Sequence, residues 1–308
     1  MSEGSDRART VLVVGSVALD DIETPLEKRE MVLGGSASYS SLAAAAFAPV
    51  RLVGVVGEDF PADYRDLYRS RGLDLEGLQV VSGKTFRWGG VYEENMNRRR
   101  TLFTELNVFE HFNPELPEAY CDSTHILLAN IHPGLQGHVL DQATAPAFVA
   151  CDTMDLWIDI ARPELLQLLP RVDLLSLNDT EAEQLTGCFN LVDAGRTILS
   201  MGPRYVVIKK GEHGAMLLSE AGLFLIPAFP VGAVVDPTGA GDTFLGALLG
   251  SIAAADGVED RSVRRALLDA TVMASFAVEE FSPYSIGRLE QDAFSARREA
   301  FRAMLTVE

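Results

Sequence analysis

The sequence predicts an α/β protein with three layers, α/β/α, in which helices cover both faces of a mostly parallel central sheet and a small β-sheet forms a lid. From about residue 120 onward, short apolar runs alternate with helical stretches, a pattern typical of right-handed βαβ units and of a buried parallel sheet. Two segments, at about 21–33 and 84–106, break this rhythm. With 308 residues, the chain is long enough to bury one large core with a small appendage.

The expected strands are short apolar runs, and the expected helices are the stretches between them that show helical periodicity. We expect strands at 10–18, 51–56, 124–129, 147–152, 172–177 and 205–209. We expect helices at 37–47, 134–143, 162–169 and 243–255, and two further helices within 180–200. These elements make residues 10–308 one expected domain, preceded by a loose tail at 1–9.

The two irregular segments have the features of a separate β-sheet. Residues 21–33 are rich in charge and lack a helical period, whereas 84–106 alternate apolar and polar residues around a polar tip, as in a long hairpin. We therefore expect a lid over one end of the main domain, where it would exclude water from a site beneath it. Three arginines at 98–100 lie at the hairpin tip, and the neighbouring Glu93 and Glu94 favour a solvated position for them.

Composition argues against several classes of partner. The 26 basic and 44 acidic residues give a net charge of −18, which disfavours nucleic acid and an anionic membrane surface as partners. Every apolar run is shorter than a membrane span. Cys121, Cys151 and Cys188 are odd in number and widely spaced, which favours free thiols in a reducing, cytoplasmic compartment.

The most informative stretch is residues 236–244, with the sequence DPTGAGDTF. A strand-like run at 232–235 precedes it, and a helical pattern follows it. Gly239, Ala240 and Gly241 allow backbone N–H groups to converge at a helix N-terminus, where the helix dipole favours an anion. Asp242 places a carboxylate beside this anion hole, an arrangement that suits phosphoryl transfer if the acid takes the proton of an incoming hydroxyl.

This string resembles the C-terminal motif of the ribokinase/PfkB family of ATP-dependent carbohydrate and nucleoside kinases, and the resemblance extends over about residues 10–290. It implies a ribokinase-like fold, with ATP and Mg²⁺ as cofactors. It also implies that Asp242 is the general base, that Thr238 contacts the nucleotide and that a K⁺ ion binds near Asp236.

Two further motifs lie where the family binds its nucleotide. Asn178 and Glu181 follow the expected strand 172–177 and have the spacing of a helix capping box. They also resemble the family's N-x-x-E motif, which implies that they hold Mg²⁺ and the ATP phosphates largely through water. The stretch 209–214 contains a G-x-x-G turn, and the resemblance implies nucleotide contacts for Lys209, Gly211 and Gly214.

The acceptor site is expected near the N-terminus. The resemblance implies that Asp20, at the end of the first expected strand, binds sugar hydroxyls and that the Gly34-Gly35 turn brings backbone close to the substrate. A carboxylate can accept hydrogen bonds from two vicinal hydroxyls, which suits a polyol. Asn130 and His132 follow the strand 124–129 and Asp152 ends the strand 147–152, so these side chains are expected to line the cleft.

Tyr39 departs from the family pattern, because many relatives have Asn four residues after the second glycine. The tyrosine either belongs to the core or faces the substrate. Plant-type inositol kinases look similar at this point, with an aromatic residue after G-G-x-A-S. Stacking of a nucleoside base on Tyr39 is an equal alternative.

Together these features predict a cytoplasmic, ATP-dependent kinase that phosphorylates an alcohol group of a sugar, polyol or nucleoside, with a homodimer formed through the lid. Two alternatives stay open. A kinase of sugar phosphates would need basic residues in the pocket, and only Lys84, Arg87 and the tip arginines are available. A protein that senses a sugar or nucleotide on the same fold would not turn it over, although the intact 236–242 motif argues against this.

Overall fold

The computed structural model of the chain describes residues 9–96 and 98–306, so the predicted tail at 1–9 lies outside it except for Arg9. In this part of the chain the main sheet has nine strands in the order β13-β12-β11-β10-β9-β8-β1-β4-β5. All neighbours pair in parallel except at β12, which is antiparallel to β11 and to β13. The strands are β1 (Val11–Val14), β4 (Val50–Gly57), β5 (Leu78–Val81), β8 (His125–Leu128), β9 (Phe148–Asp152), β10 (Leu174–Asn178), β11 (Tyr205–Lys209), β12 (Ala215–Ser219) and β13 (Gly222–Ile226).

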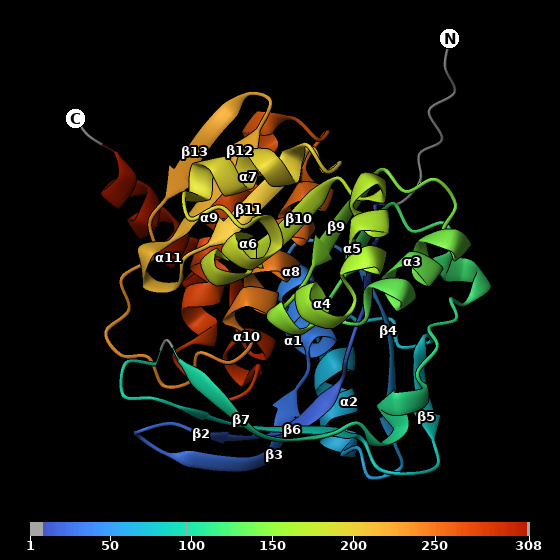
Figure 1. Ribbon diagram of the computed structural model, residues 1–308. Coiled ribbons are helices and arrows are strands. Elements are labelled where there is room, and N and C mark those ends of the chain that lie inside the picture. The colour runs from blue at the N-terminus through green and yellow to red at the C-terminus, as the bar shows by residue number, and fades with distance from the viewer. Residues whose placement is uncertain (1–8, 97, 307–308) are drawn as a thin grey trace.

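Helices cover both faces of this sheet (Figure 1), as predicted. Side chains of β1 alternate between two hydrophobic clusters, with Val11 and Val13 in one and Leu12 and Val14 in the other. The first cluster includes α1 (Ser36–Ala44), α2 (Ala62–Ser70), α8 (Ala240–Ala254), α9 (Asp260–Ala277), α10 (Tyr284–Gly287) and α11 (Gln291–Leu305). The second includes α3 (Pro133–Gln142), α4 (Asp155–Ile160), α5 (Arg162–Leu168), α6 (Asp179–Thr186) and α7 (Leu191–Leu199). Short 3₁₀ turns lie at Asn107–His111, Glu118–Tyr120, Leu169–Arg171 and Gly211–His213.

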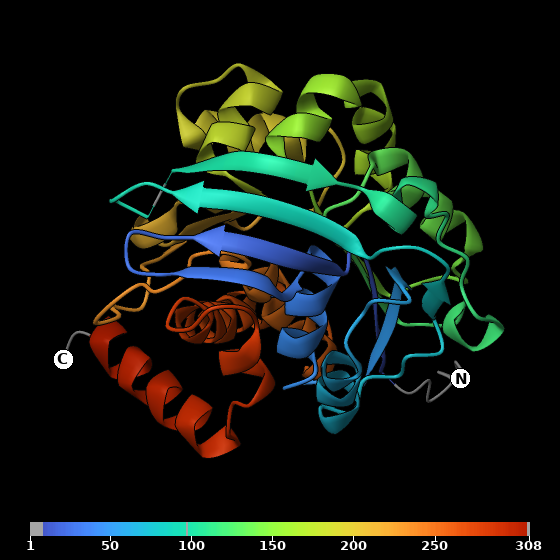
Figure 2. The ribbon, with the colours of Figure 1, turned by 90° about the horizontal axis from the view of Figure 1, so that it is seen from below.

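A second sheet, with strand order β3-β2-β6-β7, forms the predicted lid. It contains β2 (Ala18–Glu23), β3 (Lys28–Gly34), β6 (Phe86–Tyr92) and β7 (Arg99–Glu105). The central pair β2 and β6 is parallel and both edge strands are antiparallel to it. Figure 2 shows this sheet lying across one end of the main body.

Helices α1 and α8 pack closely at the centre of the molecule. A Cβ at Gly246 would lie 2.2 Å from the carbonyl oxygen of Ser40, and one at Gly250 would lie 2.8 Å from that of Ala44. Glycine at both positions therefore permits contact between the two helix backbones. This packing brings the N-terminus of α8 beside the N-terminus of α1.

Two predicted strands differ from the structure. The run 10–18 divides at residues 15–17, where the chain leaves β1 and enters the lid as β2, so Asp20 lies within a lid strand. The run 232–235 is irregular, and the N–H of Val235 donates to the carbonyl of Val278 at 2.7 Å. Its apolar character reflects packing, because Val235 contacts a small cluster with Ile22 and Phe281 beneath the lid.

The structure was also searched for a membrane-spanning helix. Over residues 9–96 and 98–306, no helix combines the length and the apolar character needed to cross a bilayer.

Candidate active site

The 236–242 motif forms a turn that leads directly into α8. Gly239 has φ of 73°, the left-handed conformation that glycine adopts without strain, and it is the N-cap of the helix. No side chain of the described residues caps this helix end. The N–H of Ala240 donates to the carbonyl of Pro237 at 3.3 Å, and the N-terminus of the helix favours an anion. The helix begins at Ala240, three residues before the predicted start.

Asp242 lies in the first turn of α8 and is partly buried. Burial raises the pKa of Asp242 to about 7, the charge of Asp152 adds to this, and the cations Lys209 and Arg99 oppose it. The hydroxyl of Ser40 donates to the carbonyl of Asp242 at 3.0 Å and ties the turn to α1. A carboxyl with a pKa near neutrality is suited to accept a proton at physiological pH.

The ends of three parallel strands bring further charges to this point. In the register of the main sheet, Asp152 of β9 lies opposite Ser176 of β10, and Asn178 of β10 lies opposite Lys209 of β11. The ammonium of Lys209 lies 3.1 Å from Asp152 Oδ1 and 3.2 Å from the place that a Cβ on Gly241 would occupy. Lys209 therefore lies against the first turn of α8. Burial disfavours its ammonium form, but the carboxylates around it outweigh this and raise the pKa of Lys209.

Asn178 and Glu181 form the predicted capping box at the start of α6. The N–H of Glu181 donates to Asn178 Oδ1 at 2.8 Å, and the N–H of Asn178 donates to Glu181 Oε2 at 2.7 Å. Burial raises the pKa of Glu181 to about 7, Lys209 lowers it and Asp152 raises it further. A cation near these carboxylates would favour their charged forms. Among the described residues, no three His, Cys, Asp or Glu side chains form a ready-made metal site.

Asp20 lies in lid strand β2, against the Gly34-Gly35 turn. A Cβ on Gly34 would lie 1.9 Å from Asp20 Oδ2, so only glycine admits this carboxylate. Burial raises the pKa of Asp20 to about 8, the charges of Asp236 and Asp242 raise it further, and Arg99 opposes them. The candidate acceptor-binding acid and the candidate base therefore belong to one acidic cluster, in which Asp20 is buried and Asp242 is partly buried.

Tyr39 belongs to the core, as one of the two alternatives predicted. Its side chain is only 1% exposed, and a Cβ on Gly239 would lie 2.4 Å from three of its ring carbons. The ring face in contact with Gly239 is therefore not free to stack on a base. The Tyr39 hydroxyl is buried and has no hydrogen-bond partner in the described part of the chain.

Asp236 and Thr238 complete the motif. Asp236 Oδ1 accepts a hydrogen bond from the N–H of Thr238 at 2.9 Å, whereas the buried Oδ2 has no partner among the described residues. Burial raises the pKa of Asp236. An unpaired buried carboxylate oxygen is a suitable ligand for a cation.

Four other predicted residues, Asn130, His132, Gly211 and Gly214, also have structural roles. The side-chain oxygen of Asn130 accepts a hydrogen bond from Trp157 at 2.7 Å, and its amide nitrogen lies 3.1 Å from the sulfur of Met154. His132 caps α3 by accepting from the N–H of Gly134. The Gly211–Gly214 turn lies between β11 and β12, with positive φ at both glycines, and a Cβ on Gly214 would lie 2.0 Å from a backbone oxygen of Ile226. These positions have clear structural roles.

Sequence reasoning missed two lid residues, Tyr92 and Arg99. Tyr92 is buried and its hydroxyl accepts a hydrogen bond from Thr238 Oγ1 at 3.0 Å. Arg99 was expected at a solvated tip; it is exposed overall, yet its charge acts on both Asp20 and Asp242. The signal was the hairpin register, since Tyr92 and Arg99 are the first pair across the turn. Arg87, by contrast, pairs with Asp21 within the lid.

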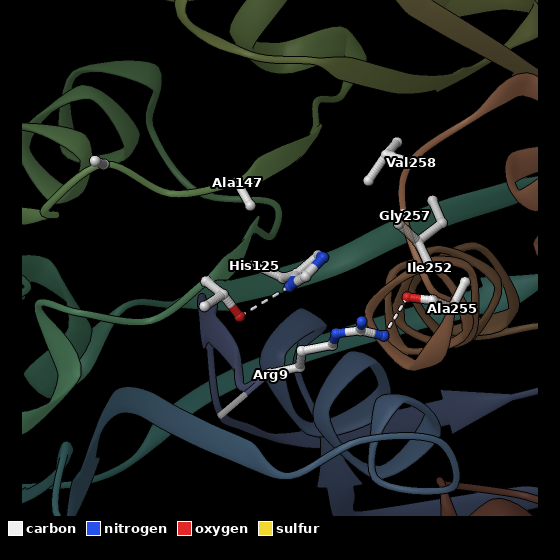
Figure 3. A pocket seen from close by; sticks show the side chains of 9 residues that line it. Arg9, His125, Ala147, Ile252, Ala255, Gly257 and Val258 are labelled. Carbon is white, nitrogen blue, oxygen red and sulfur yellow. Dashed lines mark hydrogen bonds between the residues drawn. The ribbon is translucent and has the colours of Figure 1, made fainter. Parts of the chain in front are cut away.

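A separate hollow of about 390 Å³ lies at the other end of the parallel strands, away from the 236–242 motif (Figure 3). Its lining includes Arg9, which precedes β1, and His125, which begins β8. Ala255, at the C-terminal end of α8, also lines it. Arg9 donates to the carbonyl of Ala255, and His125 Nδ1 lies 3.0 Å from Thr124 Oγ1. None of the predicted site residues lines this hollow.

The profile of the pfkB family carbohydrate kinases matches residues 9–288. The chain belongs to this family. It is an ATP-dependent kinase of the carbohydrate and nucleoside class. A cytidine kinase of Thermococcus kodakarensis is 31% identical over 246 residues, which are 78% of this chain and 87% of the relative. The ribokinase of Bacillus subtilis is 25% identical over 89% of this chain and 94% of its own length.

Solved structures show the same fold. The nucleoside kinase of Burkholderia thailandensis in complex with inosine superposes with a TM-score of 0.77 at 22% identity, over 94% of this chain and 97% of that one. A ribokinase II of E. coli in complex with ATP and Mg²⁺ gives a TM-score of 0.78 at 20% identity, over 95% of this chain and 99% of that one.

Proposed function

We propose that this kinase transfers the γ-phosphoryl group of ATP to a hydroxyl of a nucleoside, with Asp242 as the general base. One observation carries the proposal: Asp20 and Asp242 lie in a single acidic cluster, in which the charge of Asp242 raises the pKa of Asp20. An acceptor that enters this cluster would have a hydroxyl bound by one carboxylate and deprotonated by the other.

The residues of the motif have complementary roles in this step. Asp242 takes the proton of the attacking hydroxyl, and the backbone N–H groups of Gly239, Ala240 and Gly241 stabilise charge on the transferring group. Asp20 and the Gly34-Gly35 turn orient the acceptor. The lid excludes water, which would otherwise compete with the acceptor.

The nucleotide end fits ATP with Mg²⁺. Lys209 lies against the anion hole and supplies a positive charge there, while Asn178 and Glu181 would hold the metal ion through water. When bound, Mg²⁺ neutralises phosphate charge. Thr238, Gly211 and Gly214 complete the proposed nucleotide contacts. We also propose K⁺ at Asp236, whose Oδ2 has no partner in the described residues.

The acceptor class rests on the relatives. The cytidine kinase is more similar in sequence than the ribokinase, at 31% against 25% identity. A sugar-phosphate acceptor is less well supported, because Arg87 is paired with Asp21. Exposed Met31 and Leu102, on the two edge strands of the lid, support the proposed homodimer, which sedimentation would detect.

A coupled assay for ADP tests the proposal against cytidine, inosine, adenosine, ribose, fructose and myo-inositol. We expect turnover with a nucleoside that exceeds turnover with ribose, and a loss of about 10²–10⁴-fold in Asp242→Asn. Turnover of ribose or fructose alone would contradict the acceptor class. Activity of Asp242→Asn within tenfold of the wild type would contradict the assigned base.

A further inference from the structure

We propose that Tyr92 is a positioning residue that couples lid closure to the anion-hole turn. The inference rests on the proposed function, since it concerns how the same site is assembled. Tyr92 ends lid strand β6, whereas its hydrogen-bond partner Thr238 directly precedes Gly239 in the turn. The two residues are 146 positions apart in the chain, so only the folded arrangement of lid and body brings them together.

The contact between these residues is buried. Both Tyr92 and Thr238 are 8% exposed, and their oxygens are 3.0 Å apart. Arg99 lies opposite Tyr92 in the hairpin register. Because the Tyr92–Thr238 hydrogen bond is shielded, water does not readily replace it. Loss of this bond would therefore change the geometry of the turn.

An apolar cluster reinforces this link. Tyr92 packs with Ile22 of β2 and Phe281, and Val235 packs against the same cluster. The segment that leads into the motif is therefore covered by the lid on one side. Residues 232–235 belong to neither sheet, and the segment is also held by the N–H groups of Val235 and Asp236, which donate to the carbonyl of Val278.

The consequence is a structural link from the lid to the catalytic turn. When the lid is closed, the Tyr92–Thr238 bond fixes the residue before Gly239, and hence the direction of the first N–H groups of α8. With the lid displaced, that bond is broken and the turn loses this support. Chemistry would then follow closure, which protects ATP from water.

The test is a double-mutant cycle with Tyr92→Phe and Thr238→Val, which remove the two hydroxyls and retain most of the shape. With cytidine and MgATP, we expect kcat to fall about 3- to 10-fold in Tyr92→Phe, with KM for ATP within about twofold of the wild type. The double variant should fall no further than Thr238→Val alone, because both changes break one bond. Hydrogen exchange of the backbone over 235–239 should accelerate in Tyr92→Phe.

Tyr64→Phe is the matched control. The Tyr64 hydroxyl donates to the carbonyl of Met31 at 3.1 Å and joins α2 to lid strand β3, away from the motif. This variant should leave exchange over 235–239 unchanged. Additive losses in the cycle, or unchanged kcat in Tyr92→Phe, would overturn the inference. If Asp242→Asn stays active, the proposed function itself fails; if only Tyr92→Phe stays active, the coupling alone fails.

Discussion

The ring of Tyr39 lies directly on Gly239, so that a Cβ at this glycine would be 2.4 Å from three ring carbons. The contact joins α1, which follows the Gly34-Gly35 turn, to the N-cap of α8. An aromatic residue at position 39 is thus part of the wall that shapes the anion hole.

Gly239→Ala should abolish phosphoryl transfer, because the new Cβ overlaps the Tyr39 ring. Gly187→Ala is a matched control, since Gly187 has φ of 74° and nothing within 4 Å of its Cβ position. Both variants place alanine in a left-handed conformation, at a cost of about 1 kcal/mol. Only Gly239→Ala should also lose activity, by at least about 10²-fold, as measured by kcat. Partial recovery in Gly239→Ala combined with Tyr39→Leu would confirm the overlap as the cause.

The activity should depend on pH through Asp242. Its pKa is raised to about 7, and only the ionised carboxylate can accept a proton. The value of kcat/KM should therefore fall about tenfold per unit below pH 7 and reach a plateau above it. Lys209→Met removes a cation that lowers the pKa of Asp242, and so should move the acid limb to higher pH. An acid limb near the ordinary pKa of an aspartate would contradict this assignment.

Asp20→Asn should stabilise the ligand-free protein at high pH and weaken acceptor binding. The pKa of Asp20 is raised to about 8 in the folded state, so the folded chain holds the proton more tightly than the unfolded chain. The stabilisation of the folded state that comes from protonated Asp20 is fully present below about pH 4 and is lost as pH rises through 8. Urea unfolding should show a gain of a few kcal/mol for the variant at pH 9 and little gain at pH 4. KM for the acceptor should rise with little change in KM for ATP.

Lys209→Met should destabilise the fold as well as slow the reaction. The ammonium is the partner of Asp152 at 3.1 Å and lies among buried carboxylates. Its removal leaves these charges without compensation, at a cost of about 3–5 kcal/mol. Adding Asp152→Asn should restore part of the stability, because one uncompensated charge is then removed. Denaturation by urea at pH 8 would measure both changes, and a double variant less stable than Lys209→Met would contradict the pairing.

Glu181→Gln should separate helix capping from metal binding. A glutamine oxygen can still accept the hydrogen bond from the N–H of Asn178, so the melting temperature should change little. The lost charge should raise the Mg²⁺ concentration needed for half-maximal rate by about tenfold or more. Asn178→Ala provides the converse comparison, with about 1 kcal/mol of stability lost from the cap. An unchanged Mg²⁺ dependence in Glu181→Gln would rule out the metal role.

Local patterns predicted most elements well. The strands at β8, β9, β10 and β11 and the hairpin β6–β7 lie close to the expected ranges, because their periodicity reflects burial on one or two faces. The strand predicted at 232–235 was wrong, since apolar residues that pack under a lid give the same sequence pattern as a strand. The first strand was predicted too long, because no local signal marks the crossing at residues 15–17 from main sheet to lid.

The sequence by itself determined the reaction class, because residues 236–242 contain, in order, the glycines and acids of the motif that this family shares. It also determined the capping box at Asn178 and Glu181, which depends on residues three apart. Only the tertiary structure decided that Tyr39 supports Gly239, that Lys209 lies against the anion hole and that Tyr92 and Arg99 reach the motif from the lid. These relationships join distant segments, and their distances follow from helix packing and strand register, which no single stretch of the chain contains.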